Sequence, residues 1–226
     1  MIALALDTSA ALAGVGLFDD GELMGEVTWR TNQNHSRELM PAVEWLLQAR
    51  GTDKSDLGAV FVCLGPGSYA GLRVGLSTAK GLALGLNLPL VGIGRLAADA
   101  EPLALENGTL VYAVQAAGRA ELAWAAYQRQ KGELREALAP SLSPESALGD
   151  LIASGSIACG ELPPTLKATL ASKGVIIAAN QTGRIGAIGR LGAVRVAKGD
   201  TDNVDSLVPM YLREPAIGPQ PPVPSN

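Results

Sequence analysis

The chain has 226 residues, of which 47% are hydrophobic and 18% are charged, and its formal net charge at pH 7 is −4. This composition excludes a disordered chain, and 226 residues are enough for one large or two small domains. The acidic balance argues against a stand-alone nucleic-acid binder, because affinity for phosphate backbones comes mainly from Lys and Arg. The sequence contains neither an apolar run suited to a membrane span nor a basic signal-peptide region. We therefore expect a cytoplasmic protein without membrane contact.

The first half predicts three strands followed by alternating helices and strands. Strands are expected at 2–6, 12–18 and 22–28, with a glycine turn between the last two. A helix is expected at 36–50, where Pro41 either bends the helix or begins it. A buried strand begins at Ala59, a helix covers 71–86, a strand covers 89–93 and a helix covers 95–105. The order is βββαβαβα.

The second half repeats this order with little sequence identity. Strands are expected at 109–115, 122–128 and 133–138, and a helix at 144–153 begins after Ser143 as its cap. Strand, helix, strand and helix follow at 156–159, 164–172, 175–178 and 184–198. We predict a duplicated α/β protein with lobes at 1–106 and 107–199. A segment at 200–214 should pack back on the lobes, and the Pro-rich tail at 215–226 should be disordered.

The glycine elbow after the strand that begins at Ala59 is the most distinctive local feature. Gly65-Pro66-Gly67-Ser68 joins this strand to the helix, with Ser68 as its expected cap. A helix N-terminus and free backbone N–H groups suit a phosphate. The elbow is neither a Walker loop nor GxGxxG, so a plain tight turn is equally compatible with it.

The helix that follows has small residues on more than one side. Gly71, Gly75, Ala79 and Ala83 share one face, although each helical glycine costs roughly 0.5–1 kcal/mol against alanine. The sheet of the same domain accounts for one apolar face of this helix. Further glycines, at 81 and 85, indicate a second neighbour.

Motifs along the chain carry a resemblance to a known family. GPGSYAGLRVGLSTAKGLA closely resembles the signature of the TsaB (YeaZ) family, together with the opening IALALDTS, HSRELMP and the closing PMYLR. These motifs frame residues 1–213. The resemblance implies an actin-like ATPase (ribonuclease-H-like) fold and a non-catalytic partner of TsaD in transferring a threonylcarbamoyl group to the adenosine beside the tRNA anticodon.

Few residues in the chain suggest catalysis or metal binding. Asp7 and Thr8 end a strand, where they suit a phosphate–metal site or close a turn by hydrogen bonds. His35 is the only histidine, so the chain lacks the paired metal-binding histidines of TsaD and of the older glycoprotease reading. A small-molecule kinase would need a second acidic loop, but the matching strand end reads Gln115-Ala116 where relatives usually have Asp-Ala. Cys63 and Cys159 should be buried free thiols.

The resemblance also sets expectations for partners and sites. TsaD and TsaE are the expected partners, with a homodimer in isolation, tRNA bound only through the complex, and ATP or ADP only at an interface of the assembled complex. The alternatives are a small-molecule kinase and a self-contained homodimeric module. No metal and no catalytic residue is expected. The candidate nucleotide or phosphate residues are Asp7, Thr8, Gly67, Ser68 and Arg73. The candidate interface residues are His35, Leu39, Met40, Val43, Leu46, Leu47, Gly71, Leu72, Gly75, Leu76, Ala79 and Leu82.

Overall fold

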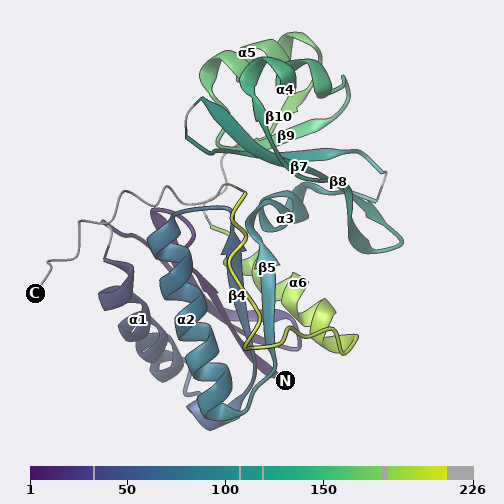
Figure 1. Ribbon diagram of the computed structural model, residues 1–226. Coiled ribbons are helices and arrows are strands. Elements are labelled where there is room, and N and C mark those ends of the chain that lie inside the picture. The colour runs from purple at the N-terminus through teal and green to yellow at the C-terminus, as the bar shows by residue number, and fades with distance from the viewer. Residues whose placement is uncertain (33, 107, 119, 180–182, 213–226) are drawn as a thin grey trace, which may run out of the picture.

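A computed structural model describes residues 1–32, 34–106, 108–118, 120–179 and 183–212. It contains two five-stranded sheets, one above the other in Figure 1. The strands are β1 Ile2–Asp7, β2 Leu12–Asp19, β3 Glu22–Arg30, β4 Leu57–Gly65, β5 Leu90–Gly94, β6 Val111–Ala116, β7 Glu121–Gln130, β8 Glu133–Pro144, β9 Ile157–Gly160 and β10 Ile176–Ile177. The helices are α1 His35–Ala49, α2 Tyr69–Leu86, α3 Arg95–Ala100, α4 Glu145–Leu151, α5 Pro164–Ser172 and α6 Ile185–Ala197, with 3-10 turns η1 Lys54–Asp56 and η2 Glu101–Leu103.

The two sheets have the same strand order. The first runs β3-β2-β1-β4-β5 and the second runs β8-β7-β6-β9-β10, with the first three strands of each antiparallel and the other pairings parallel. Alternate side chains of a strand point to opposite faces, so the apolar runs of β1 and β6 fill two cores each. Leu4 and Leu6 face one core and Ala3 and Ala5 the other. The predicted duplicated βββαβαβα order is confirmed.

Each sheet carries a pair of helices on one face and a single helix on the other. Helices α1 and α2 cover the first sheet, and α4 and α5 cover the second. The opposite faces hold helices that have changed sides. Helix α6, from the end of the second half, packs on the first sheet, and α3, from the end of the first half, packs mainly on the second. Figure 1 shows α3 between the two sheets.

Because of this exchange, we name the lobes by their sheets. The first lobe is the first sheet with α1, α2 and α6, and the second lobe is the second sheet with α3, α4 and α5. Glycines in α6 make its close approach possible, since a Cβ at Gly189 or Gly192 would overlap the rings of Phe18 and Phe61. The exchange joins two lobes that the sequence presented as consecutive units.

Two local predictions need correction, and one open alternative is decided. Ser143 is not a helix cap, because it lies in β8 and its Oγ accepts a hydrogen bond from Trp124 Nε1 at 3.0 Å. The helix expected at 95–105 ends at Ala100 and continues only as the 3-10 turn η2. Pro41 does not begin α1 but lies inside it, in the second turn.

Residues 200–212 contact the first lobe. Asp202 forms a bridge with Leu90, and the backbone N–H of Met210 donates to the Leu64 carbonyl at 2.8 Å. Lys80 of α2 donates to the Asp205 carbonyl at 3.2 Å. The disorder predicted for 215–226 lies outside the described residues. Among the described helices, none has both the length and the hydrophobicity needed to cross a bilayer.

Candidate functional site

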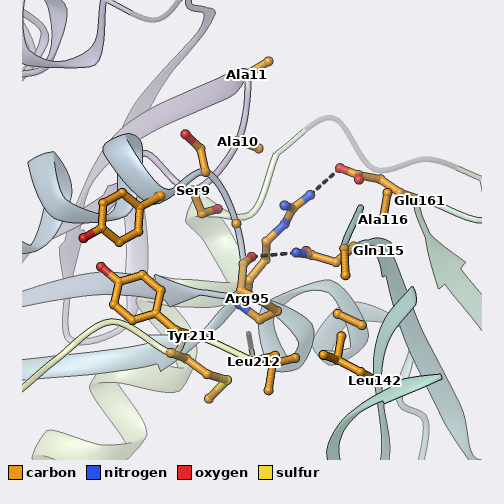
Figure 2. A pocket seen from close by; sticks show the side chains of 17 residues that line it. Ser9, Ala10, Ala11, Arg95, Gln115, Ala116, Leu142, Glu161, Tyr211 and Leu212 are labelled. Atoms are coloured by element: carbon orange, nitrogen blue, oxygen red, sulfur yellow. Dashed lines mark hydrogen bonds and ion pairs between the residues drawn. The ribbon is translucent and has the colours of Figure 1, made fainter. Parts of the chain in front are cut away.

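A cleft of about 710 Å³ opens between the two lobes (Figure 2). Its volume is in the range of small-molecule sites. The first sheet and its elbow supply one wall, the second sheet another, and the C-terminal segment closes a third side. The lining residues are Ser9, Ala10, Ala11, Pro66, Gly67, Ser68, Tyr69, Arg95, Gln115, Ala116, Ala117, Ala123, Leu142, Glu161, Met210, Tyr211 and Leu212.

Asp7, the carboxylate expected to hold a phosphate or its metal, is not part of the cleft lining. It is 2% exposed, accepts a hydrogen bond from the Ser9 N–H at 2.8 Å, and pairs with Arg184 at 3.0 Å. Burial alone would raise the pKa of Asp7, but Arg184 and the Ser9 N–H outweigh it and the pKa lies below its usual range. Asp7 is therefore ionised and paired with an internal cation.

A chain of ion pairs continues from Asp7 across the molecule. Arg184 Nε also binds Asp99 of α3 at 2.7 Å, and Arg95, one turn earlier on α3, lies 3.8 Å from Asp99. Arg95 then reaches Glu161, just after β9, at 2.6 Å, as the dashed line in Figure 2 marks. We call Asp7, Arg184, Asp99, Arg95 and Glu161 the central charge network. It connects β1 of the first lobe with the second lobe.

Gln115, which replaces the expected second acidic residue, also joins the lobes. Its Nε2 donates to the Pro66 carbonyl at 2.8 Å (Figure 2), and the side chain is 3% exposed. A carboxylate here could not donate this bond and would face a carbonyl oxygen. The residue at the end of β6 thus anchors the second lobe to the elbow of the first.

The elbow predicted to bind a phosphate is tightly packed on the turn after β1. Ser68 caps α2, since its Oγ accepts from the Gly71 N–H at 3.3 Å, and its own N–H donates to the Ser9 carbonyl at 2.8 Å. A Cβ at Gly67 would overlap that carbonyl. Thr8 is buried, and its Oγ1 hydroxyl donates a hydrogen bond to the Gly71 carbonyl at 2.7 Å. Gly67 and Ser68 line the cleft, while Thr8 is occupied in holding α2.

Arg73 lies outside the cleft, on the exposed side of α2. Its guanidinium stands 5.4 Å from the centre of the Tyr69 ring and donates to the Tyr69 hydroxyl at 3.0 Å. Tyr69 in turn stacks on Tyr211 with ring centroids 5.2 Å apart. The structure therefore brings Gly67, Ser68 and Tyr69 together at the cleft and leaves Arg73 at its outer rim.

Most of the residues expected at a partner interface are inaccessible, which corrects that expectation. On α1 the buried ones are His35, Leu39, Val43, Leu46 and Leu47. On α2 they are Gly71, Leu72, Gly75, Leu76 and Ala79. The face of α2 that carries Gly71 and Gly75 packs on the turn after β1 of the same lobe. A Cβ at Gly71 would overlap the Thr8 carbonyl, and a Cβ at Gly75 would overlap the Thr8 Oγ1. Only Met40 and Leu82 of the set are partly exposed.

The opposite side of α2 is open. A Cβ at Gly81 or Gly85 would meet no atom within 4 Å, and Leu84 is 65% exposed. Trp45 of α1 is also exposed, at 59%. The second set of helical glycines, rather than the first, marks the accessible face.

His35 begins α1 and packs against the Gly71 backbone. It is 6% exposed, and burial lowers its pKa, so the ring is neutral at pH 7. The described residues hold no group of three or more His, Cys, Asp or Glu side chains that could bind a metal ion. Cys63 and Cys159 are free and buried, as predicted.

Sequence reasoning missed Arg95, Asp99, Glu161 and Arg184. They lie far from Asp7 in the sequence, and single charged residues near helix starts ordinarily indicate solvent contact. The only available signal was that Arg95 and Asp99 are four residues apart in an otherwise apolar helix, a spacing that suits an ion pair.

Comparison with protein families finds a match over most of the chain. The family described as TsaD: tRNA N6-adenosine threonylcarbamoyltransferase matches residues 25–178. The tRNA threonylcarbamoyladenosine biosynthesis protein TsaB of Escherichia coli (strain K12) is 36% identical over 148 residues, which are 63% of this chain and 62% of that protein. TsaB of Bacillus subtilis (strain 168) is 38% identical over 96 residues, 42% of each chain. The matched segments thus span less than two thirds of these relatives.

A solved structure extends the likeness to nearly the whole chain. YeaZ from Pseudomonas aeruginosa superposes with a TM-score of 0.78 at 24% identity, covering 93% of this chain and 100% of that one. Together with the two sheets of matching order, this confirms the predicted actin-like α/β fold.

Proposed function

The chain belongs to the TsaB (YeaZ) family, and from this premise we propose that it is the non-catalytic partner subunit of a TsaD protein in tRNA threonylcarbamoyladenosine synthesis. In this role it binds and activates TsaD, which catalyses the transfer of the threonylcarbamoyl group to the adenosine beside the tRNA anticodon. TsaE joins through the complex. tRNA is held by the partner, since a chain with a net charge of −4 lacks the counter-charge for a phosphate backbone.

The central charge network is the observation that carries the non-catalytic part of the proposal. A phosphate–metal site needs carboxylates free to coordinate a cation. Here Arg184 occupies Asp7, and the end of β6 offers the amide of Gln115, already bonded to the Pro66 carbonyl. This arrangement favours a binding protein over the small-molecule kinase.

The open side of α2 is the surface proposed for TsaD. We call the residues Ser77, Gly81, Leu84 and Gly85 of α2 the outer face. Apolar or small side chains that are exposed on a helix already packed on its sheet indicate a further partner. Missing side chains at Gly81 and Gly85 let another helix approach closely. A second copy would use the same face in a homodimer when TsaD is absent.

One substitution tests this surface without touching the core. Gly81→Arg adds a charged side chain into open space on α2 and removes a helical glycine, so the fold should be kept. The matched control is Ala168→Arg, an exposed position on α5, the corresponding helix of the second lobe. Each variant is co-expressed with TsaD from the same source, and the tRNA is analysed for threonylcarbamoyladenosine by mass spectrometry.

Gly81→Arg should lose co-purification with TsaD and lower the modified nucleoside, whereas Ala168→Arg should behave as the wild type. Burying an unpaired charge costs enough to weaken binding by about 10-fold or more. Undiminished binding by Gly81→Arg would place the interface elsewhere. Full tRNA modification in cells lacking this protein would reject the proposed role itself.

ATP or ADP is proposed only for the assembled complex, at the rim formed by Gly67, Ser68 and Arg73. The N-terminus of α2 attracts anions and the guanidinium of Arg73 is exposed beside it. Arg73→Ala should weaken nucleotide binding by the TsaD complex, measured by calorimetry, while leaving the affinity between the two proteins unchanged. Equal nucleotide affinity for both forms would mean that the elbow is only a turn.

A further inference from the structure

The inner part of the central charge network is buried and electrically balanced. Its four inner members are Asp7, Arg184, Asp99 and Arg95, each no more than 12% exposed in its side chain, and their two positive and two negative charges cancel. Buried ions are tolerated only when they are paired in this way. Removing one member leaves its partners as uncompensated buried charges, which is strongly unfavourable.

The members come from elements that belong to different lobes. Asp7 ends β1 of the first sheet, and Arg184 immediately precedes α6, which packs on that sheet. Asp99 and Arg95 lie on α3, which packs mainly on the second sheet, and Glu161 follows β9 of that sheet. Any rotation that opens the cleft must separate at least one of these pairs.

In this cleft the cation between the carboxylates of Asp7 and Asp99 is an arginine of the chain, Arg184. The guanidinium donates through Nε to Asp99 at 2.7 Å and through Nη1 to Asp7 at 3.0 Å. Two-site donation fixes direction as well as distance, which a point charge does not. Gln115 adds a second, uncharged tie from β6 to the Pro66 carbonyl.

We propose that Arg184 is a positioning residue that holds the two lobes in one arrangement, so that the width of the cleft is set by the chain itself and needs no nucleotide or metal ion to fix it. The same network reaches α2, because Thr8 and Ser9, which follow Asp7, bind the first turn of α2 and its cap. Lobe arrangement and the position of the outer face are therefore set together. This last step rests on the proposed function, whereas the arrangement of the lobes does not.

The lobes are tested directly by distance measurement on the isolated full chain. Spin labels are attached at Lys54→Cys in the first lobe and Ala168→Cys in the second, both exposed, and the sample is diluted with unlabelled protein to remove distances between copies. Pulsed electron paramagnetic resonance then gives the distribution of distances. Arg184→Gln is compared with Arg195→Gln, which removes the α6 guanidinium that pairs with Asp200 and Asp202.

The unsubstituted protein should give one narrow distribution, unchanged by ADP with Mg²⁺. Arg184→Gln should broaden it at least twofold and Arg195→Gln should not. Because Arg184→Gln risks unfolding, Glu161→Gln, at the half-exposed end of the network, serves as a second variant and should broaden the distribution less. The proposal is overturned if Arg184→Gln and Glu161→Gln both give a distribution as narrow as that of the unsubstituted protein. It is also overturned if the unsubstituted protein already gives a distribution as broad as that of Arg184→Gln.

A second readout separates this inference from the proposed function. Affinity for TsaD should fall about 10-fold in Arg184→Gln and stay unchanged in Arg195→Gln. Broadened distances with unchanged affinity would support the role of Arg184 in holding the lobes but would separate it from the partner surface. Unchanged distances with lower affinity would contradict the role of Arg184 in holding the lobes.

Discussion

The two lobes share one sheet order but differ in the helix pairs that cover the corresponding faces. Helix α2 has 18 residues and only two charges, Arg73 and Lys80, whereas its counterpart α5 has nine residues. The inner side of α2 approaches the Thr8 backbone, while the glycine of α4, Gly149, makes only ordinary contacts at 3.6 Å. A sheet of this order can evidently be covered by shorter helices. The additional length and apolar surface of α2 therefore serve something other than the core.

The strand ends of the two lobes differ as well. Asp7 is two residues after Ala5 in β1, and Gln115 is two residues after Ala113 in β6. Both therefore end the run of side chains that faces the single helix. Asp7 is held by a charge and Gln115 by a carbonyl. The same position in two related lobes has thus become part of a charge network in one lobe and a neutral tie in the other.

The largest expected effect is on the charged strand end. Asp7→Asn leaves Arg184 with one carboxylate instead of two, and breaking a buried pair typically costs about 3–5 kcal/mol of unfolding free energy. Gln115→Glu in the other lobe should cost less, about 1–3 kcal/mol, because the new carboxyl either loses the hydrogen bond to the Pro66 carbonyl or stays protonated to keep it. Urea unfolding at pH 7 measures both. Equal losses would erase the contrast between the strand ends.

The same pair predicts a pH dependence. The folded pKa of Asp7 lies below its unfolded value, so its contribution is complete above about pH 4 and disappears as the pH falls through the folded value. Burial raises the pKa of Asp99, which opposes this trend, so the quantity to follow is the difference between wild type and Asp7→Asn. That difference should shrink as the pH falls from about 4 through the folded pKa of Asp7. A constant difference over this range would show that Asp7 acts without its charge.

An intermediate effect is expected in the helix pairs. Gly75→Ala should lower the unfolding free energy by about 1–3 kcal/mol, because the new methyl group would overlap Thr8 Oγ1. Gly149→Ala makes the same chemical change in α4, where the methyl finds ordinary contact distances, and helix propensity should raise stability by about 0.5–1 kcal/mol. Chemical denaturation measures the unfolding free energy of both variants, and unchanged m-values would show that the two can be compared. A neutral Gly75→Ala would mean that α2 can move away from the turn.

The smallest effect concerns the two thiols, one in each lobe. Burial raises the pKa of Cys63 to about 12 and also raises that of Cys159, so neither forms a reactive thiolate at pH 8. Both should stay unreactive toward a disulfide reagent until the protein unfolds, and then react together as urea increases. Reaction of one thiol at a lower urea concentration would show that its lobe opens independently.

Periodicity and turn chemistry predicted the element order because a buried strand and an amphipathic helix each leave a local pattern. The pattern says that a helix face is apolar or small, but not which surface covers it. For this reason Gly71 and Gly75 were assigned to a partner although they contact Thr8. The exchange of α3 and α6 has the same origin, since each helix would suit either sheet. The pairing of Asp7 with Arg184 spans 177 positions and has no local signal.

The exchange of helices also determines when the protein can fold during its synthesis. Phe18 and Phe61 belong to the first half of the chain, yet the helix that covers them ends at Ala197. Until α6 has left the ribosome, the first sheet carries a bare apolar face, and a fragment ending near residue 106 would carry it permanently. The nascent protein therefore depends on the synthesis of α6, or on a chaperone, to cover that face, and its two halves cannot be separated into independent domains.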